Sequence, residues 1–246
     1  MDGRSEATRI LEHLIELRRR VIFSLGALMV GTALAFAFHE PIIAFLREPF
    51  TRIPEETFGG QLFVHSVTEG FLVRIRVALL AGAIIALPCI VYNILRFVFP
   101  GLYANERRTI GLAIAGSTVL AVGGFLYSYT QLLPISLRFL TSSGFIPGDV
   151  GVLLSYRMSL GFVLQVLLIS VLLFQLPVIV VVLMKLDLLP RESALKATPY
   201  VIVVLVVISS ILTPPDVISQ IGLALPLAVL YFLAILVGKI FRLGEG

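Results

Sequence analysis

Long apolar segments separated by short polar ones decide what this chain can fold into. Of its 246 residues, 58% are hydrophobic and only 14% are charged, and the mean hydropathy is +1.03. A soluble domain needs more charge for its surface, so we predict an integral membrane protein. Backbone polar groups inside a bilayer must be paired within the chain, and the long apolar runs therefore predict helices.

Six membrane-spanning helices are predicted, in a single transmembrane domain that covers residues 1–246. The predicted spans are residues 21–38, 67–98, 109–133, 156–184, 199–212 and 219–238. At about 1.5 Å per residue the fifth is about 21 Å long, which is too short for a hydrocarbon core of about 30 Å. The fold class is therefore an all-α membrane bundle in which the last spans are short.

Proline and glycine residues predict where the chain turns between spans. Five residues are assigned to structural turns, two after the second span and three after the fifth: Pro100, Gly101, Pro214, Pro215 and Asp216. Residues 39–65 are expected to form an ordered loop with short helices. Pro88 is expected to kink the second span. Residues 185–196 are expected to form a polar loop.

The N-terminal segment, residues 1–20, is predicted to be an amphipathic helix that lies at the membrane surface. Its apolar residues recur at helical spacing and continue into the first span: Ile10, Leu14, Leu17 and Val21. Glu16 and Arg20 are four residues apart, so they are expected to form a helix-stabilising pair. A cleaved signal peptide is the alternative, but residues 21–38 are longer than an apolar region of about 7–15 residues.

The distribution of Lys and Arg predicts which side of the membrane each loop occupies. Thirteen of the 19 lie at the two termini, in the loop at 97–108 together with Arg96 just before it, and in the loop at 185–196, and four lie in the other loops. Cytoplasmic loops carry the excess of positive charge. Both termini and the 97–108 loop are therefore predicted to be cytoplasmic.

Catalytic and cofactor-binding motifs are missing from the sequence. It has no GxxxxGK[ST], HExxH or GxSxG motif, and no charged residue in the middle of a predicted span. Cys89 has no partner for an intrachain disulfide. His39 and His65 are predicted to lie near the outer interface. Binding of a shared metal ion by these two residues is possible but is the less favoured interpretation. We therefore expect neither an enzyme, nor a metal or cofactor site, nor a nucleic-acid-binding protein.

Two acids set among bases, Glu16 and Glu106, are the candidate functional residues. From their spacing alone, surface ion pairs worth about 0–1 kcal/mol each are the favoured interpretation. The alternative is that the two carboxylates together bind two neighbouring arginines of a partner, because charge-assisted bonds to a guanidinium are worth about 1.5–3 kcal/mol each.

Three segments resemble one known family. They are HLIELRRR at residues 13–20, FVFPGLYANERR at 97–108 and LTPPDVISQ at 212–220. In order and spacing they are similar to the TatC family, the multispanning receptor subunit of the twin-arginine protein translocase. The resemblance extends from about residue 11 to residue 239.

The resemblance implies a glove-shaped six-helix protein of the bacterial inner membrane. Such a protein binds signal peptides with paired arginines, works in an oligomeric complex with the single-span subunits TatA and TatB, and exports folded proteins by the proton-motive force. It assigns signal-peptide binding to six residues: Glu16, Arg18, Phe97, Glu106, Arg107 and Arg108. It assigns docking of a partner helix to four: Gln175, Thr213, Ser219 and Gln220.

The chain departs from the family pattern at three positions. Gln175 and Phe232 stand where the family commonly has glutamate, and Leu95 stands where it often has tryptophan. Gln175 keeps the capacity to hydrogen-bond without the charge. An ordinary hydrogen bond between helices and a contact to a partner helix are both open for this residue.

A secondary transporter for a small solute is the alternative function. Broken helices build midplane sites in transporters, and Gln165, Gln175 and Gln220 would line such a site. The sequence has no internal repeat and no buried ion pair to support it. An intramembrane enzyme lacks any nucleophile and base at a suitable spacing.

Overall fold

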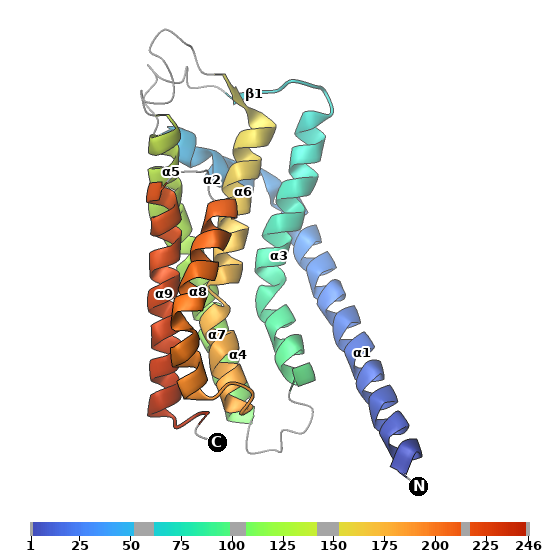
Figure 1. The fold of residues 1–246 in the computed structure, drawn as a ribbon. Coiled ribbons are helices and arrows are strands. Elements are labelled where there is room, and N and C mark those ends of the chain that lie inside the picture. Colours follow the sequence, from blue (N-terminus) through green and yellow to red (C-terminus); the bar gives the residue numbers. More distant parts are fainter. Residues whose placement is uncertain (1, 52–61, 99–106, 142–152, 213–216, 245–246) are drawn as a thin grey trace.

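The structure is a computed structural model that describes residues 2–51, 62–98, 107–141, 153–212 and 217–244. This part of the chain is almost entirely helical (Figure 1). In chain order the elements are α1 (Asp2–Ala37), α2 (His39–Thr51), β1 (Leu62–Phe63), α3 (Glu69–Val98), α4 (Arg107–Tyr127), the π-helical turn η2 (Ser128–Leu132), α5 (Leu133–Leu140), β2 (Leu154–Ser155), α6 (Tyr156–Leu173), α7 (Leu176–Lys185), α8 (Arg191–Leu212) and α9 (Val217–Ile240).

Six helical segments in the described ranges are long and apolar enough to cross a membrane, which confirms the predicted number. They are residues 11–37, 69–97, 111–140, 156–185, 191–210 and 220–240. Both chain ends lie at the same end of the bundle, which we call the terminal end (Figure 1). The opposite end carries β1 and β2 and is called the strand end.

Two spans contain irregular turns, each next to a proline. Pro177 cannot donate a backbone hydrogen bond, and the fourth span changes there from α6 to α7 through Phe174 and Gln175. Pro134 follows the π-helical turn, in which the backbone N–H of Leu133 donates to the carbonyl of Ser128. The third span is thereby continuous from α4 through α5.

The second span behaves differently, because α3 stays helical through its proline. Pro88 lies inside α3, which changes direction along its length (Figure 1). A short helix was also predicted within residues 39–65, between the first and second spans, and it is present as α2, which continues the chain directly after α1.

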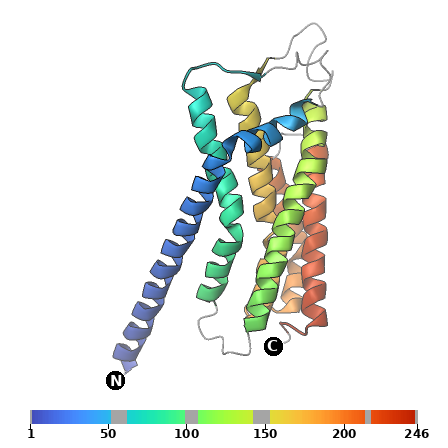
Figure 2. The ribbon, with the colours of Figure 1, turned by 180° about the vertical axis from the view of Figure 1, so that it is seen from behind.

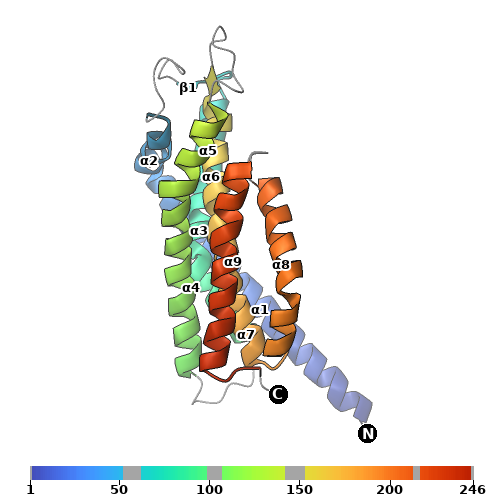
Figure 3. The ribbon, with the colours of Figure 1, turned by 60° about the vertical axis from the view of Figure 1, so that its left-hand side comes forward.

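The loop predicted at residues 185–196 is wrong in its second half. Residues from Arg191 onward are helical, so α8 has 22 residues and is about 33 Å long at 1.5 Å per residue. Polar residues at 191–196 concealed the helix start, because the prediction followed hydropathy alone. At the strand end, α8 and α9 nonetheless stop short of α5 and α6 (Figures 1 and 3).

The N-terminal segment is helical and runs into the first span, as predicted. α1 continues without interruption from Asp2 to Ala37, and its two halves share one axis (Figure 2). The position of this segment at the membrane surface stays a prediction. Its apolar side chains outside the bundle are exposed, including Leu14 at 53% and Ile15 at 67%. The amphipathic stripe therefore extends the first span toward the terminal end.

α1 is attached to the bundle mainly by a close crossing with α3. Gly31 and Gly82 meet there, and a Cβ added at Gly31 would lie 2.6 Å from the carbonyl oxygen of Gly82. A Cβ at Gly82 would lie 2.5 Å from the backbone nitrogen of Thr32. The two backbones are thus in direct contact, as small residues allow in membrane helices.

A buried carboxylate organises the strand end. Glu69, which is 5% exposed, accepts hydrogen bonds from the backbone N–H groups of His65 (2.7 Å) and Arg157 (2.9 Å) and from the hydroxyl of Ser155 (3.4 Å). It thereby joins the start of α3 to the start of α6. The parallel pair of β1 and β2 beside it was not predicted, since two residues per strand leave no recognisable pattern.

Candidate functional site

Glu16 of α1 lies at the terminal end and is half-buried. The guanidinium Nη2 of Arg20 donates to its Oε1 over 3.2 Å, which confirms the predicted pair. A partly exposed ion pair at this helical spacing contributes about 0.3–0.5 kcal/mol. Arg18, two residues after Glu16, is exposed. The carboxylate is therefore held by a weak partner that another guanidinium can displace.

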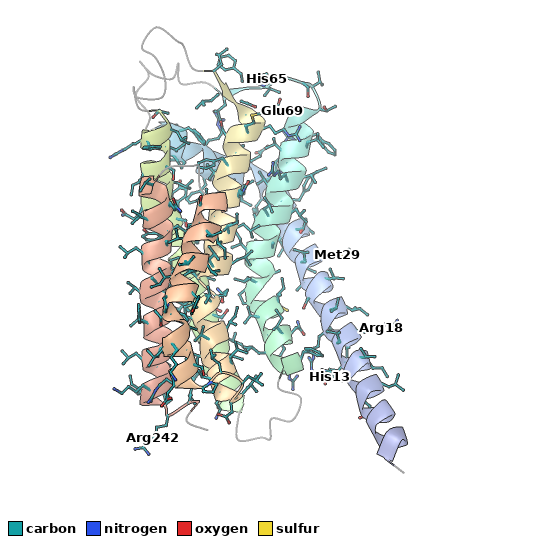
Figure 4. All side chains as sticks on the ribbon, viewed as in Figure 1. His13, Arg18, Met29, His65, Glu69 and Arg242 are labelled. Atoms are coloured by element: carbon teal, nitrogen blue, oxygen red, sulfur yellow. The ribbon has the colours of Figure 1, made fainter. Side chains whose placement is uncertain are left out.

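A ring stack joins α1 to the end of α3. The imidazole of His13 and the phenyl ring of Phe97 have their centroids 4.4 Å apart and are inclined by 22°. Figure 4 shows His13 between α1 and the lower end of α3. The stack places the α1 segment that carries Glu16 beside the point where the chain leaves α3.

The remaining residues predicted to bind a signal peptide fall on or next to the loop that follows α3. Pro100, Gly101 and Glu106 lie outside the described residues. Arg107 and Arg108 begin α4 at the terminal end, and the structure describes their backbone but not their side chains. The structure therefore brings Glu16, Phe97 and the start of α4 to one end of the bundle, and the distance from Glu16 to Glu106 stays a prediction.

Gln175 is buried at the break between α6 and α7. Its Oε1 accepts from the hydroxyl of Ser117 over 2.6 Å, and its Nε2 donates to the carbonyl oxygens of Ser117 (3.2 Å) and Val171 (3.4 Å). This confirms the expectation of a hydrogen bond between helices, here from the α6–α7 break to α4. Phe232, the other departure from the family pattern, is 48% exposed on α9.

The other residues assigned to partner docking follow α8 or begin α9 in the sequence. Gln220 donates through Nε2 to the carbonyl oxygen of Val206 over 3.1 Å, which ties α9 to α8. Ser219 is in α9, with only its backbone described. Thr213 and the turn residues Pro214, Pro215 and Asp216 lie outside the described residues.

A shared polar site of the kind a small-solute transporter needs is not formed by the three glutamines. Gln175 is bonded toward α4, Gln220 is bonded toward α8, and Gln165 is exposed on α6. The two histidines at the strand end also make separate local contacts. His39 bonds through Nδ1 to the carbonyl of Phe36 at 2.8 Å, and His65 lies 3.9 Å from Glu69.

Sequence reasoning missed two tyrosines that join distant helices. The hydroxyl of Tyr127 donates to the carbonyl of Gly222, and that of Tyr231 donates to the carbonyl of Ala194 over 2.8 Å. A tyrosine inside an apolar run indicates that its hydroxyl has a hydrogen-bond partner, because a buried hydroxyl without a partner destabilises the fold. The sequence does not say which backbone carbonyl provides it.

The sequence is similar to that of a known protein family. A family model described as "Sec-independent protein translocase protein (TatC)" matches residues 12–226. The TatC protein of Aquifex aeolicus is 35% identical over 231 residues, which cover 94% of this chain and 95% of that protein. The TatC protein of Carboxydothermus hydrogenoformans is 32% identical, over 95% of this chain and 93% of that protein.

Solved structures agree with the described fold. A crystal structure of the twin-arginine translocase receptor TatC has a TM-score of 0.79 at 35% identity, covering 93% of this chain and 98% of that one. A second, of TatC in DDM, has a TM-score of 0.82 at 35% identity, covering 92% of this chain and 99% of that one. These matches confirm the all-α membrane fold, and with the family model they show that the chain belongs to the TatC family, whose members are protein translocase components.

Proposed function

We propose that this protein is the receptor that binds paired-arginine signal peptides of folded proteins for export. Both termini and the 97–108 loop are on the cytoplasmic side of a bacterial inner membrane. The binding site is formed by the α1 segment around Glu16 and the loop that ends at Glu106. Arg18, Phe97, Arg107 and Arg108 complete it.

The stack of His13 on Phe97 is the observation that carries this proposal. The two rings fix α1 against the end of α3, where the loop to Glu106 begins. Glu16 is one helical turn from His13 on α1, because residues three apart share a helix face. Since α4 starts at Arg107, Glu106 immediately precedes in the sequence a helix that begins at the same end of the bundle.

Two carboxylates at this end give a physical reason for selecting paired arginines. A guanidinium can form two parallel hydrogen bonds with a carboxylate, whereas a lysine ammonium is a point charge. At Glu16 the incoming arginine replaces Arg20, and the weak intrahelical pair costs little to break. At Glu106 it gains a charge-assisted bond, so binding requires both positions of the peptide to carry arginine.

Partner helices from TatA and TatB dock along the fifth and sixth spans in this proposal. α8 presents exposed apolar side chains at Val203, Val204 and Val207. Thr213, Ser219 and Gln220 supply polar contacts, whereas Gln175 is buried inside the bundle and bonded to α4. Transport draws on the proton-motive force, because one charge moved across 100 mV gains about 2.3 kcal/mol and the sequence has no nucleotide-binding motif.

Crosslinking to a photoreactive signal peptide tests the site. We expect Glu106→Gln and Glu16→Gln each to reduce crosslinking at least tenfold, because each removes one charge-assisted bond. Glu106→Asp should lose less, since the charge stays but the reach shortens. Glu192→Gln is the control, as Glu192 is an exposed acid in the first turn of α8. Unchanged crosslinking in the Glu16 and Glu106 variants would exclude the proposed role.

A further inference from the structure

A large apolar cavity opens between helices near the terminal end, away from the α1 site. Its volume is about 620 Å³, and it is bordered by α4, α7 and α9 and by the end of α3. The lining includes Leu112 and Gly116 of α4, Val181 of α7 and Leu233 of α9. These positions lie within the segments that are apolar enough to cross a membrane, so the cavity is at bilayer depth.

One charged side chain lines this cavity among the described residues, and it is at the edge. Lys185 is the last residue of α7, and Phe241 and Leu243 from the chain after α9 complete that edge. Lys239 and Arg242, both exposed, follow at the same end of α9. Figure 4 shows Arg242 at the bottom of the bundle. The cavity is thus apolar inside and positively charged at its mouth.

This pattern matches an amphipathic anion. We propose that the cavity binds one phospholipid with an anionic headgroup, whose acyl chain lies against α4, α7 and α9 and whose phosphate contacts Lys185. Basic pockets between membrane helices on the cytoplasmic side are suited to such headgroups. The apolar lining offers nothing to a soluble anion.

The size of the cavity argues against a partner helix as its occupant. A helix with side chains is about 10 Å across, so about 8 Å of its length would fill 620 Å³. That is little more than one turn, far less than a spanning helix needs. A volume of a few hundred Å³ is in the range of pockets that hold small molecules.

Two glycines of α4 provide a matched pair of variants. A Cβ added at Gly116 meets no atom within 4 Å, and because Gly116 lines the cavity, we expect the side chain of Gly116→Leu to enter it. A Cβ at Gly123 also meets nothing within 4 Å, but Gly123 does not line the cavity. Gly123→Leu therefore adds the same bulk to the same helix while it leaves the cavity open.

The test is native mass spectrometry of the delipidated protein, titrated with phosphatidylglycerol or with phosphatidylcholine of the same acyl chains. We expect the wild type to bind one phosphatidylglycerol with a preference over phosphatidylcholine. Gly116→Leu should lose that molecule, and Gly123→Leu should keep it. Lys185→Gln should lower the affinity for phosphatidylglycerol about fivefold and leave phosphatidylcholine unchanged, because only the headgroup charge is affected.

The Lys185→Gln variant keeps the test decisive if Gly116→Leu does not fold, which circular dichroism would reveal. Equal retention of phosphatidylglycerol by Gly116→Leu and Gly123→Leu would overturn the proposal. So would a Lys185→Gln variant that keeps the wild-type preference. Loss of a single-span partner from Gly116→Leu, with the lipid still bound, would assign the cavity to a helix and also overturn it.

Discussion

Replacing Gly31 by alanine should loosen the packing of α1 on α3, whereas the same change at Gly26 should not. The added Cβ would lie 2.6 Å from the carbonyl oxygen of Gly82, and ordinary contact begins at 3.4 Å. The helices must therefore separate by up to 0.8 Å at this point, the difference between these two distances. Both obstructing groups are backbone, so no side chain can rotate away.

The expected cost of Gly31→Ala is about 1–3 kcal/mol, the range for overpacking a close contact. Alanine is also a better helix former than glycine by about 1 kcal/mol, which partly offsets this cost. Gly26→Ala is the matched control, since a Cβ there meets nothing within 4 Å. The control should be neutral or stabilising, and the two variants should differ by about 1–3 kcal/mol.

The measurement is the free energy of unfolding in mixed micelles, together with the rate of tryptic cleavage after the arginines at 18–20. Gly31→Ala should unfold more easily and be cleaved faster than both the wild type and Gly26→Ala. Because α1 carries Glu16, signal-peptide crosslinking should fall in parallel. Equal stability of the Gly31→Ala and Gly26→Ala variants would refute the inferred backbone contact.

Three further substitutions test individual contacts through the free energy of unfolding. Gln175→Glu should destabilise by about 1–3 kcal/mol, because the carbonyl oxygens that accept from Nε2 would face a carboxylate. Gln175→Leu loses the same bonds without introducing a charge, and it therefore separates the two effects. Glu69→Gln should cost about 1–3 kcal/mol and speed amide exchange in residues 62–69 and 153–157, since an amide group cannot accept from both backbone N–H groups. Tyr231→Phe should cost about 0.5–1.5 kcal/mol through the lost bond to Ala194, and no change would show that water replaces it.

The sequence was sufficient for the class of fold and the number of spans, because hydropathy reports directly on burial in lipid. It was insufficient where polar residues continue a helix. Arg191 starts α8 although hydropathy placed the span eight residues later, at 199. Likewise the helical spacing of residues 10–21 was recognised, but not that this segment continues α1 without a bend.

For the site, short-range contacts were predictable and long-range ones were not. The pair of Glu16 and Arg20 follows from helical spacing alone. The stack of His13 on Phe97 joins residues 84 positions apart and depends on how α1 crosses α3. That crossing in turn depends on Gly31 and its partner, and no local pattern in a single sequence identifies which two glycines meet.

The central claim is that Glu16 and Glu106 each bind one guanidinium of the signal peptide. Double-mutant cycles test it most directly, by measuring the affinity of wild-type, Glu16→Gln and Glu106→Gln protein for peptides in which either arginine is replaced by glutamine. The account predicts a coupling of about 1.5–3 kcal/mol between Glu106 and one arginine, and a similar coupling between Glu16 and the other. Effects that add to within about 0.3–0.5 kcal/mol for every combination would contradict it.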